Sequence, residues 1–166
     1  MAYNFDRLTV LIVDDCTNMQ HLLRALLMSF GFSDVHAAKS GEAGLKALES
    51  LKPDFIICDY NMAPMNGVEF IRTLRNDEVS PNRYVPIIML TGHTEMSNIL
   101  AARQAGATEF LAKPVSPQSL YKRIEMVIER PRDFVETKNF FGPDRRRSSV
   151  AEWAGQNRRD LSSYID

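Results

Sequence analysis

Short apolar runs alternate with longer helical patterns through most of the chain, from residue 8 to about residue 129. The runs have the length and the valine, isoleucine and leucine content typical of strands. Because helical patterns separate them, they predict a parallel sheet with helices on both faces, an α/β fold of the doubly wound (βα)5, flavodoxin-like kind. The five predicted strands lie at 8–13, 34–38, 55–58, 85–90 and 108–112.

The segment between the first two strands shows the clearest helical spacing. Its apolar residues recur every three or four positions, which favours one buried helix face. Gly31 is the expected end of this helix, and Ser40 and Ser116 are expected to cap the second and fifth helices. Residues 67–75 and 95–104 supply the third and fourth. The apolar face of the first helix consists of Met19, Leu22, Leu23, Leu26, Leu27 and Phe30.

Length and composition agree with one globular domain followed by a short remainder. The chain has 166 residues, of which 45% are hydrophobic and 25% charged, enough apolar material for a buried core. Two cysteines, Cys16 and Cys58, are too few for a disulfide framework. No apolar stretch approaches the length of a membrane span and the start shows no signal-peptide pattern. We expect a cytoplasmic protein with reduced thiols and no membrane insertion.

Polar residues follow four of the five strands directly. The first strand runs into Asp14 and Asp15, the third into Asp59, the fourth into Thr91 and the fifth into Lys113. Carboxyl ends of parallel strands meet at one edge of a sheet, where ligands bind in this fold class. Three carboxylates brought together repel each other, and a hard divalent cation such as Mg²⁺ is the usual remedy. The sequence therefore predicts a metal site at this edge.

The same edge has the groups needed to accept a phosphoryl group. Asp59 is the candidate nucleophile, because a carboxylate can form an acyl phosphate. Lys113 and the hydroxyl of Thr91 could neutralise the phosphoryl oxygens. Taken singly, such residues are often helix caps or turn residues, and only their joint occurrence favours a site. A phosphatase of the haloacid-dehalogenase type is a remote alternative, because it needs a D-x-D motif on the first strand, whereas Asp14 and Asp15 are adjacent.

Residues 7–129 resemble the receiver domains of two-component response regulators, most closely the single-domain CheY-like type. The motifs are LIVDD (11–15), DYNMAPMNG (59–67), MLTG (89–92) and QAGATEFLAKP (104–114). The resemblance implies a signalling protein rather than an enzyme, phosphorylated by a histidine kinase or a small acyl phosphate. It implies Asp59 as phosphoacceptor, with Thr91 and Lys113 on the phosphoryl oxygens. It also implies Mg²⁺ ligation by Asp14, Asp15, Asp59 and the backbone carbonyl of Asn61.

The resemblance further implies a conformational switch. In the family a threonine and an aromatic residue change rotamer together on activation and remodel the surface of the fourth helix, fifth strand and fifth helix. The matching residues are Thr91 and Phe110. Phe110 stands where the chemotaxis type commonly has tyrosine, so it could swing inward but could not donate a hydrogen bond. A plain core role for Phe110 is an equal alternative.

The pattern breaks at Pro131, which divides the chain into a receiver domain at 1–129 and a tail at 130–166. The tail holds 8 Lys+Arg and 6 Asp+Glu, with arginines in RRR and RR clusters. Its few aliphatic residues predict a segment that is disordered, or forms a short helix, and becomes ordered on binding a ligand.

The tail mixes arginines with acidic, amide and aromatic residues. Arginine can bond to guanine O6 and N7, tryptophan can stack, and aspartate can accept from guanine. A nucleic-acid backbone binder would usually show a larger positive excess, so an anionic guanine-containing small ligand is favoured. The alternative is a phosphorelay intermediate or kinase regulator whose tail binds protein or nucleic acid.

With NFFGPDRRRSS and WAGQNRRD, the whole chain resembles the Cle proteins, CheY-like effectors of cyclic di-GMP. The resemblance implies that the tail folds around cyclic di-GMP and that the liganded protein docks on the flagellar motor switch to control motility or surface attachment. The residues it assigns to cyclic di-GMP are Asp144, Arg145, Arg146, Arg147, Ser149, Trp153, Asn157, Arg158 and Arg159.

Overall fold

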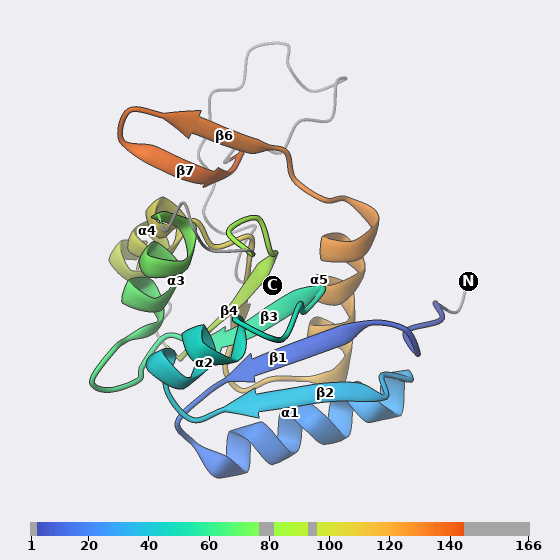
Figure 1. Cartoon of the computed structure of the whole chain (residues 1–166). Coiled ribbons are helices and arrows are strands. Elements are labelled where there is room, and N and C mark those ends of the chain that lie inside the picture. Colours follow the sequence, from blue (N-terminus) through green and yellow to red (C-terminus); the bar gives the residue numbers. More distant parts are fainter. Residues whose placement is uncertain (1–2, 77–81, 93–95, 145–166) are drawn as a thin grey trace.

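The computed structural model describes residues 3–76, 82–92 and 96–144 of the chain. Its main sheet consists of β1 (Thr9–Val13), β2 (Asp34–Ala38), β3 (Phe55–Asp59), β4 (Ile87–Thr91) and β5 (Glu109–Ala112). These strands are parallel and follow the order β2-β1-β3-β4-β5 (Figure 1). The predicted (βα)5 fold is confirmed, and each strand lies where expected apart from one or two residues at its ends.

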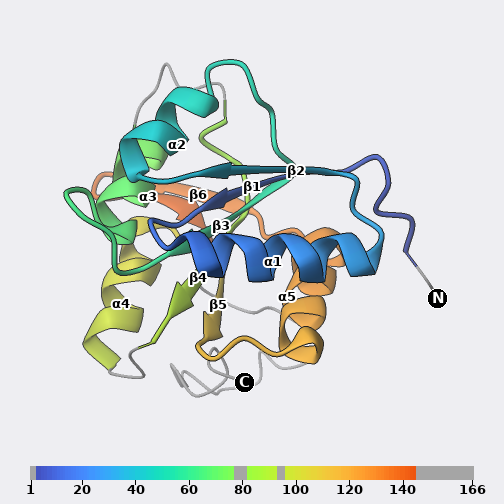
Figure 2. The same ribbon diagram turned by 90° about the horizontal axis from the view of Figure 1, so that it is seen from below.

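Five helices in the described part of the chain cover the two faces of the sheet (Figure 2). They are α1 (Thr17–Phe30), α2 (Gly41–Ala47), α3 (Gly67–Asn76), α4 (Met96–Ala105) and α5 (Pro117–Glu129). Apolar side chains of α1 and α5 pack against one face of the sheet, and those of α2, α3 and α4 against the other. The central strands β3 and β4 are buried along their whole length, as expected for strands covered on both sides.

The predicted helix boundaries are found. The hydroxyl oxygen of Ser40 accepts a hydrogen bond from the amide of Ala43 at 3.0 Å, and that of Ser116 accepts one from Ser119 at 3.1 Å. These bonds satisfy amides that lack a partner within the helix. Gly31 ends α1 with φ at 108°, a left-handed conformation that glycine adopts without steric cost. No helix among the described residues is long and apolar enough to cross a membrane.

A hairpin follows α5 in a segment for which disorder was expected. It consists of the antiparallel strands β6 (Phe134–Thr137) and β7 (Phe140–Pro143), drawn in orange at the top of Figure 1. Phe134 and Phe141 pack edge-on to Tyr84, with ring centroids 5.0 and 5.3 Å away. Aromatic contacts with the (βα)5 body therefore hold this segment in place, although it lacks an aliphatic core of its own.

Two arginines of the body complete this contact. Arg75, at the end of α3, is fully buried and donates to the carbonyls of Gly106 at 3.1 Å and Arg83 at 2.7 Å. Its guanidinium lies 4.9 Å from the centroid of the Phe134 ring, and that of Arg83 lies 3.6 Å from the centroid of Phe141. Burial lowers the pKa of Arg75 to about 9. The carbonyl and ring contacts compensate part of this desolvation, so the hairpin is part of the folded body.

We expect Phe141→Ala to lower the free energy of unfolding by about 3–5 kcal/mol, because it removes a buried ring and leaves Arg83 facing the more distant Tyr84 ring, whose centroid lies 5.9 Å from its guanidinium. Urea unfolding followed by circular dichroism measures the change. Lys138→Ala, at the exposed turn of the same hairpin, is the matched control and should change stability little. Equal stabilities of the two variants would show that the hairpin does not stabilise the body.

Candidate functional site

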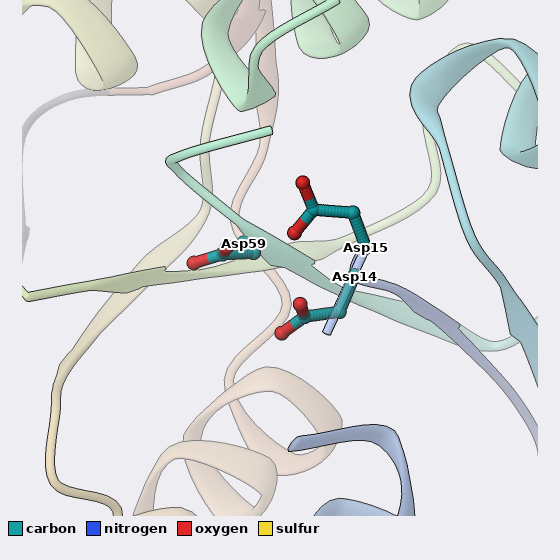
Figure 3. A group of neighbouring side chains, drawn as sticks. All are labelled: Asp14, Asp15 and Asp59. Atoms are coloured by element: carbon teal, nitrogen blue, oxygen red, sulfur yellow. The ribbon is translucent and has the colours of Figure 1, made fainter. Parts of the chain in front are cut away.

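Three carboxylates meet at the carboxyl ends of β1 and β3, as predicted. One oxygen each from Asp14, Asp15 and Asp59 lies within 4.8 Å of the others, and Figure 3 shows the three side chains facing a common space. Asp14 and Asp59 are buried at 0% and 4% exposure, whereas Asp15 is exposed. The cluster is therefore open to solvent on the Asp15 side.

Backbone pairing fixes the cluster. Asp14 follows the last residue of β1, and its amide donates to the carbonyl of Ala38 at the end of β2 at 3.0 Å. One carboxylate oxygen of Asp14 accepts from the amide of Cys16 at 2.8 Å. The side-chain amide of Gln20, from α1, donates to the carbonyls of Asp14 at 2.6 Å and Ala38 at 3.2 Å. Gln20 was not anticipated, because its role depends on where α1 crosses the strand ends.

The loop after Asp59 is also closely fitted. The amide of Gly67 donates to the carbonyl of Tyr60 at 2.9 Å. A Cβ added to Gly67 would lie 2.3 Å from the carbonyl oxygen of Asp59, so only glycine permits this approach. The hydroxyl of Tyr60 donates to Asn98 of α4 at 3.1 Å. Asn61 is exposed on this loop, two residues after Asp59.

The charges of the cluster are only partly balanced. The Nζ atom of Lys113 lies 2.7 Å from Oδ1 of Asp59, while Oδ2 of Asp14 is buried without a hydrogen-bond partner among the described residues. Burial raises the pKa of Asp14; the Cys16 amide opposes this shift and the negative charge of Asp59 adds to it. An unpartnered buried oxygen beside two further carboxylates is a donor set that fits a hard cation.

Thr91 and Phe110 lie on β4, which pairs with β3, and on β5, which pairs with β4. Thr91 is the last residue of β4, 4% exposed, and its carbonyl accepts from the amide of Lys113 at 2.9 Å. Phe110, on β5, is 1% exposed and belongs to the core under α2, α3 and α4. Thr91 and Lys113 thus lie at the same edge of the sheet as Asp59. Phe110 lies three residues before Lys113 and belongs to the core.

Of the residues assigned to cyclic di-GMP, the structure describes Asp144. Its amide donates to the carbonyl of Asp133 at 2.7 Å and closes the base of the hairpin. The other assigned residues, Arg145, Arg146, Arg147, Ser149, Trp153, Asn157, Arg158 and Arg159, lie outside the described residues.

Comparison with known proteins defines the class. Residues 10–125 match the response regulator receiver domain family, and the chain therefore belongs to it. It is 35% identical to the chemotaxis protein CheY of Pseudomonas aeruginosa over 121 residues, which cover 73% of this chain and 96% of that protein. The chain is a CheY-like, phospho-accepting signalling domain and not an enzyme.

Solved structures agree with this assignment. CheY4 of Vibrio cholerae superposes with a TM-score of 0.67 at 32% identity, covering 72% of this chain and 98% of that one. The receiver domain of the sensor histidine kinase PA1611 of Pseudomonas aeruginosa, solved with a magnesium ion coordinated in its active-site cleft, gives 0.66 at 28% identity over 74% of this chain and 98% of that one. The cluster of Asp14, Asp15 and Asp59 is consistent with the magnesium site of a receiver domain.

We expect Asp14→Asn to raise the free energy of unfolding by about 1–2 kcal/mol in buffer without divalent cations, because it removes one of two buried like charges. Urea unfolding with and without Mg²⁺ measures the effect. Added Mg²⁺ should stabilise the unmodified chain more than the variant. Asp15→Asn, at an exposed carboxylate, should change the metal-free stability less, and a metal-free loss of stability in Asp14→Asn would contradict the repulsion argument.

Proposed function

We propose that Asp59 is the phosphoacceptor of this receiver domain and that its site requires Mg²⁺. The observation that carries the proposal is the position of Asp59, 4% exposed at the end of β3, 2.7 Å from the ammonium of Lys113 and beside two more carboxylates. In the reaction, a carboxylate oxygen of Asp59 bonds to phosphorus while the bond from phosphorus to the donor breaks. The product is an acyl phosphate.

The residues around Asp59 have distinct roles. Asp14, Asp15, Asp59 and the carbonyl of Asn61 would hold Mg²⁺, which supplies positive charge for the phosphoryl oxygens. Lys113 exchanges its present contact with Asp59 for a phosphoryl oxygen, and the hydroxyl of Thr91 donates to another. Phe110 would follow Thr91 in the switch without a hydrogen bond of its own, because its ring has no hydroxyl.

Acetyl phosphate with Mg²⁺ should add one phosphoryl group to the chain, measured by intact-mass spectrometry at low temperature. Asp59→Asn should abolish the adduct, because an amide cannot form the acyl phosphate. Asp6→Asn, at an exposed carboxylate before the start of β1 and so at the end of that strand away from the cluster, should leave it unchanged. An adduct of equal yield on Asp59→Asn would place the phosphoacceptor elsewhere.

We further propose that the arginine-rich segment binds cyclic di-GMP and that the protein acts in the cytoplasm as an effector docking on the flagellar motor switch. The support is the mixed set of arginines, Trp153, Asn157 and acidic residues, which suits a guanine-containing anion better than a nucleic-acid backbone. The similarity to chemotaxis proteins fits a motor partner, and a histidine kinase would be the phosphodonor.

Calorimetry tests the ligand. Cyclic di-GMP should bind the full chain, while GTP and cyclic di-AMP should bind weakly or not at all, because the arginine contacts are specific for two guanines held together. Arg146→Ala should weaken binding several-fold, and Arg24→Ala, at an exposed arginine of α1, should not. Equal heats from the three nucleotides would refute the assignment to cyclic di-GMP.

A further inference from the structure

The side chain of Gln20 connects α1 with the ends of β1 and β2. Gln20 lies near the start of α1 and is 7% exposed. Its Nε2 atom donates to the carbonyl of Asp14 at 2.6 Å and to the carbonyl of Ala38 at 3.2 Å. The amide of Asp14 donates to the same Ala38 carbonyl at 3.0 Å. Both partners of Nε2 are carbonyl oxygens, so the side chain acts there as a donor.

A second set of bonds connects the backbone of Gln20 with the carboxylate of Asp14. The amide of Gln20 donates to the carbonyl of Cys16 at 3.1 Å, and the amide of Cys16 donates to Oδ1 of Asp14 at 2.8 Å. Asp14 is therefore held at its backbone carbonyl and at one carboxylate oxygen. The other oxygen, Oδ2, is buried without a hydrogen-bond partner among the described residues. Oδ2 is the oxygen of Asp14 that a cation can take.

A carboxylate held in this way distinguishes between divalent cations. Mg²⁺ requires near-octahedral ligands at about 2.0–2.1 Å, whereas Ca²⁺ accepts flexible geometry at about 2.3–2.6 Å and can take both oxygens of a carboxylate. The Cys16 amide occupies Oδ1, and Gln20 fixes the backbone that carries the side chain of Asp14. The arrangement therefore resists the shift and the rotation by which Asp14 would adapt to the larger cation.

We propose that Gln20 sets the preference of the cluster of Asp14, Asp15 and Asp59 for Mg²⁺ over Ca²⁺. Gln20 is a positioning residue, because it acts through Asp14 and does not itself contact the cation. This inference rests on the proposed function, which takes Asp14 as a ligand of Mg²⁺. It adds that an uncharged donor on α1, outside the carboxylate cluster, determines which cation the cluster selects.

A purely structural role of Gln20 would have a different consequence. Removing its donor takes a hydrogen bond from two carbonyls, which lowers stability. A loss of stability alone reduces the population of folded chain and leaves the affinities of the folded chain for Mg²⁺ and Ca²⁺ unchanged. The ratio of the two affinities therefore reports how Asp14 is positioned and not how stable the fold is.

The test is a titration of the isotope-labelled full chain with MgCl₂ and, separately, with CaCl₂, followed by amide chemical shifts. Gln20→Met keeps the length of the side chain and removes the donor. It should weaken Mg²⁺ binding by about tenfold, the usual loss when a partner of a metal ligand is removed, and Ca²⁺ binding by less. Gln20→Glu has the same shape and no donor. It should also lower the ratio of Mg²⁺ to Ca²⁺ affinity, because its added charge attracts both cations.

Leu27→Ala is the matched control for stability. Leu27 is fully buried and lies about two turns further along α1. Its truncation should lower the thermal unfolding midpoint and leave the ratio of affinities unchanged. An unchanged ratio in both Gln20 variants, an equal fall of the ratio in Leu27→Ala, or no preference for Mg²⁺ in the unmodified chain would overturn the inference alone. An unmodified chain that binds neither cation would overturn the proposed Mg²⁺ site as well.

Discussion

The repulsion among three carboxylates at one edge of the sheet is the constraint on which the rest of this structure depends. Parallel strands must end on the same edge, so residues that follow β1 and β3 cannot avoid each other. Asp14 and Asp59 are buried there, with Lys113 as the ammonium that contacts Asp59. A purely structural sheet edge would gain stability from neutral residues. The charges lower the stability of the fold, and this loss of stability accompanies a site that can hold a cation and accept a phosphoryl group.

The apolar core around the strand ends increases the free-energy cost of burying these charges and also strengthens the interactions that the charges make. β3 is buried along its whole length, and Cys58 beside Asp59 is so enclosed that burial raises the pKa of its thiol well above the usual value. The same low-polarity surroundings strengthen each charge interaction at the strand ends. Gln20 and Gly67 then fix the backbone around the carboxylates without adding charge. Uncharged groups therefore position the backbone that carries the carboxylates.

Much of the fold and of the site could be predicted from sequence because the signals are local or follow from topology. Ser40 and Ser116 cap helices through bonds three residues away, and the convergence of Asp14 and Asp59 follows from parallel strands. The hairpin could not be predicted in this way. Counting aliphatic residues indicated disorder, whereas Phe134 packs on Tyr84 and Arg75, which are distant in sequence. The residues close to Phe134 in the sequence do not indicate that Tyr84 and Arg75 are its partners.

The hairpin changes what kind of attachment the arginine-rich segment has. A flexible linker would let the segment move independently, so its orientation relative to the receiver would average over many states. Here the buried guanidinium of Arg75 and the ring contacts of Phe141 fix β6 and β7, and Arg132 holds the carbonyl of Asp144. The segment therefore starts from a defined point on the body. The chain thus leaves the body at a point that a buried guanidinium and aromatic contacts hold in place.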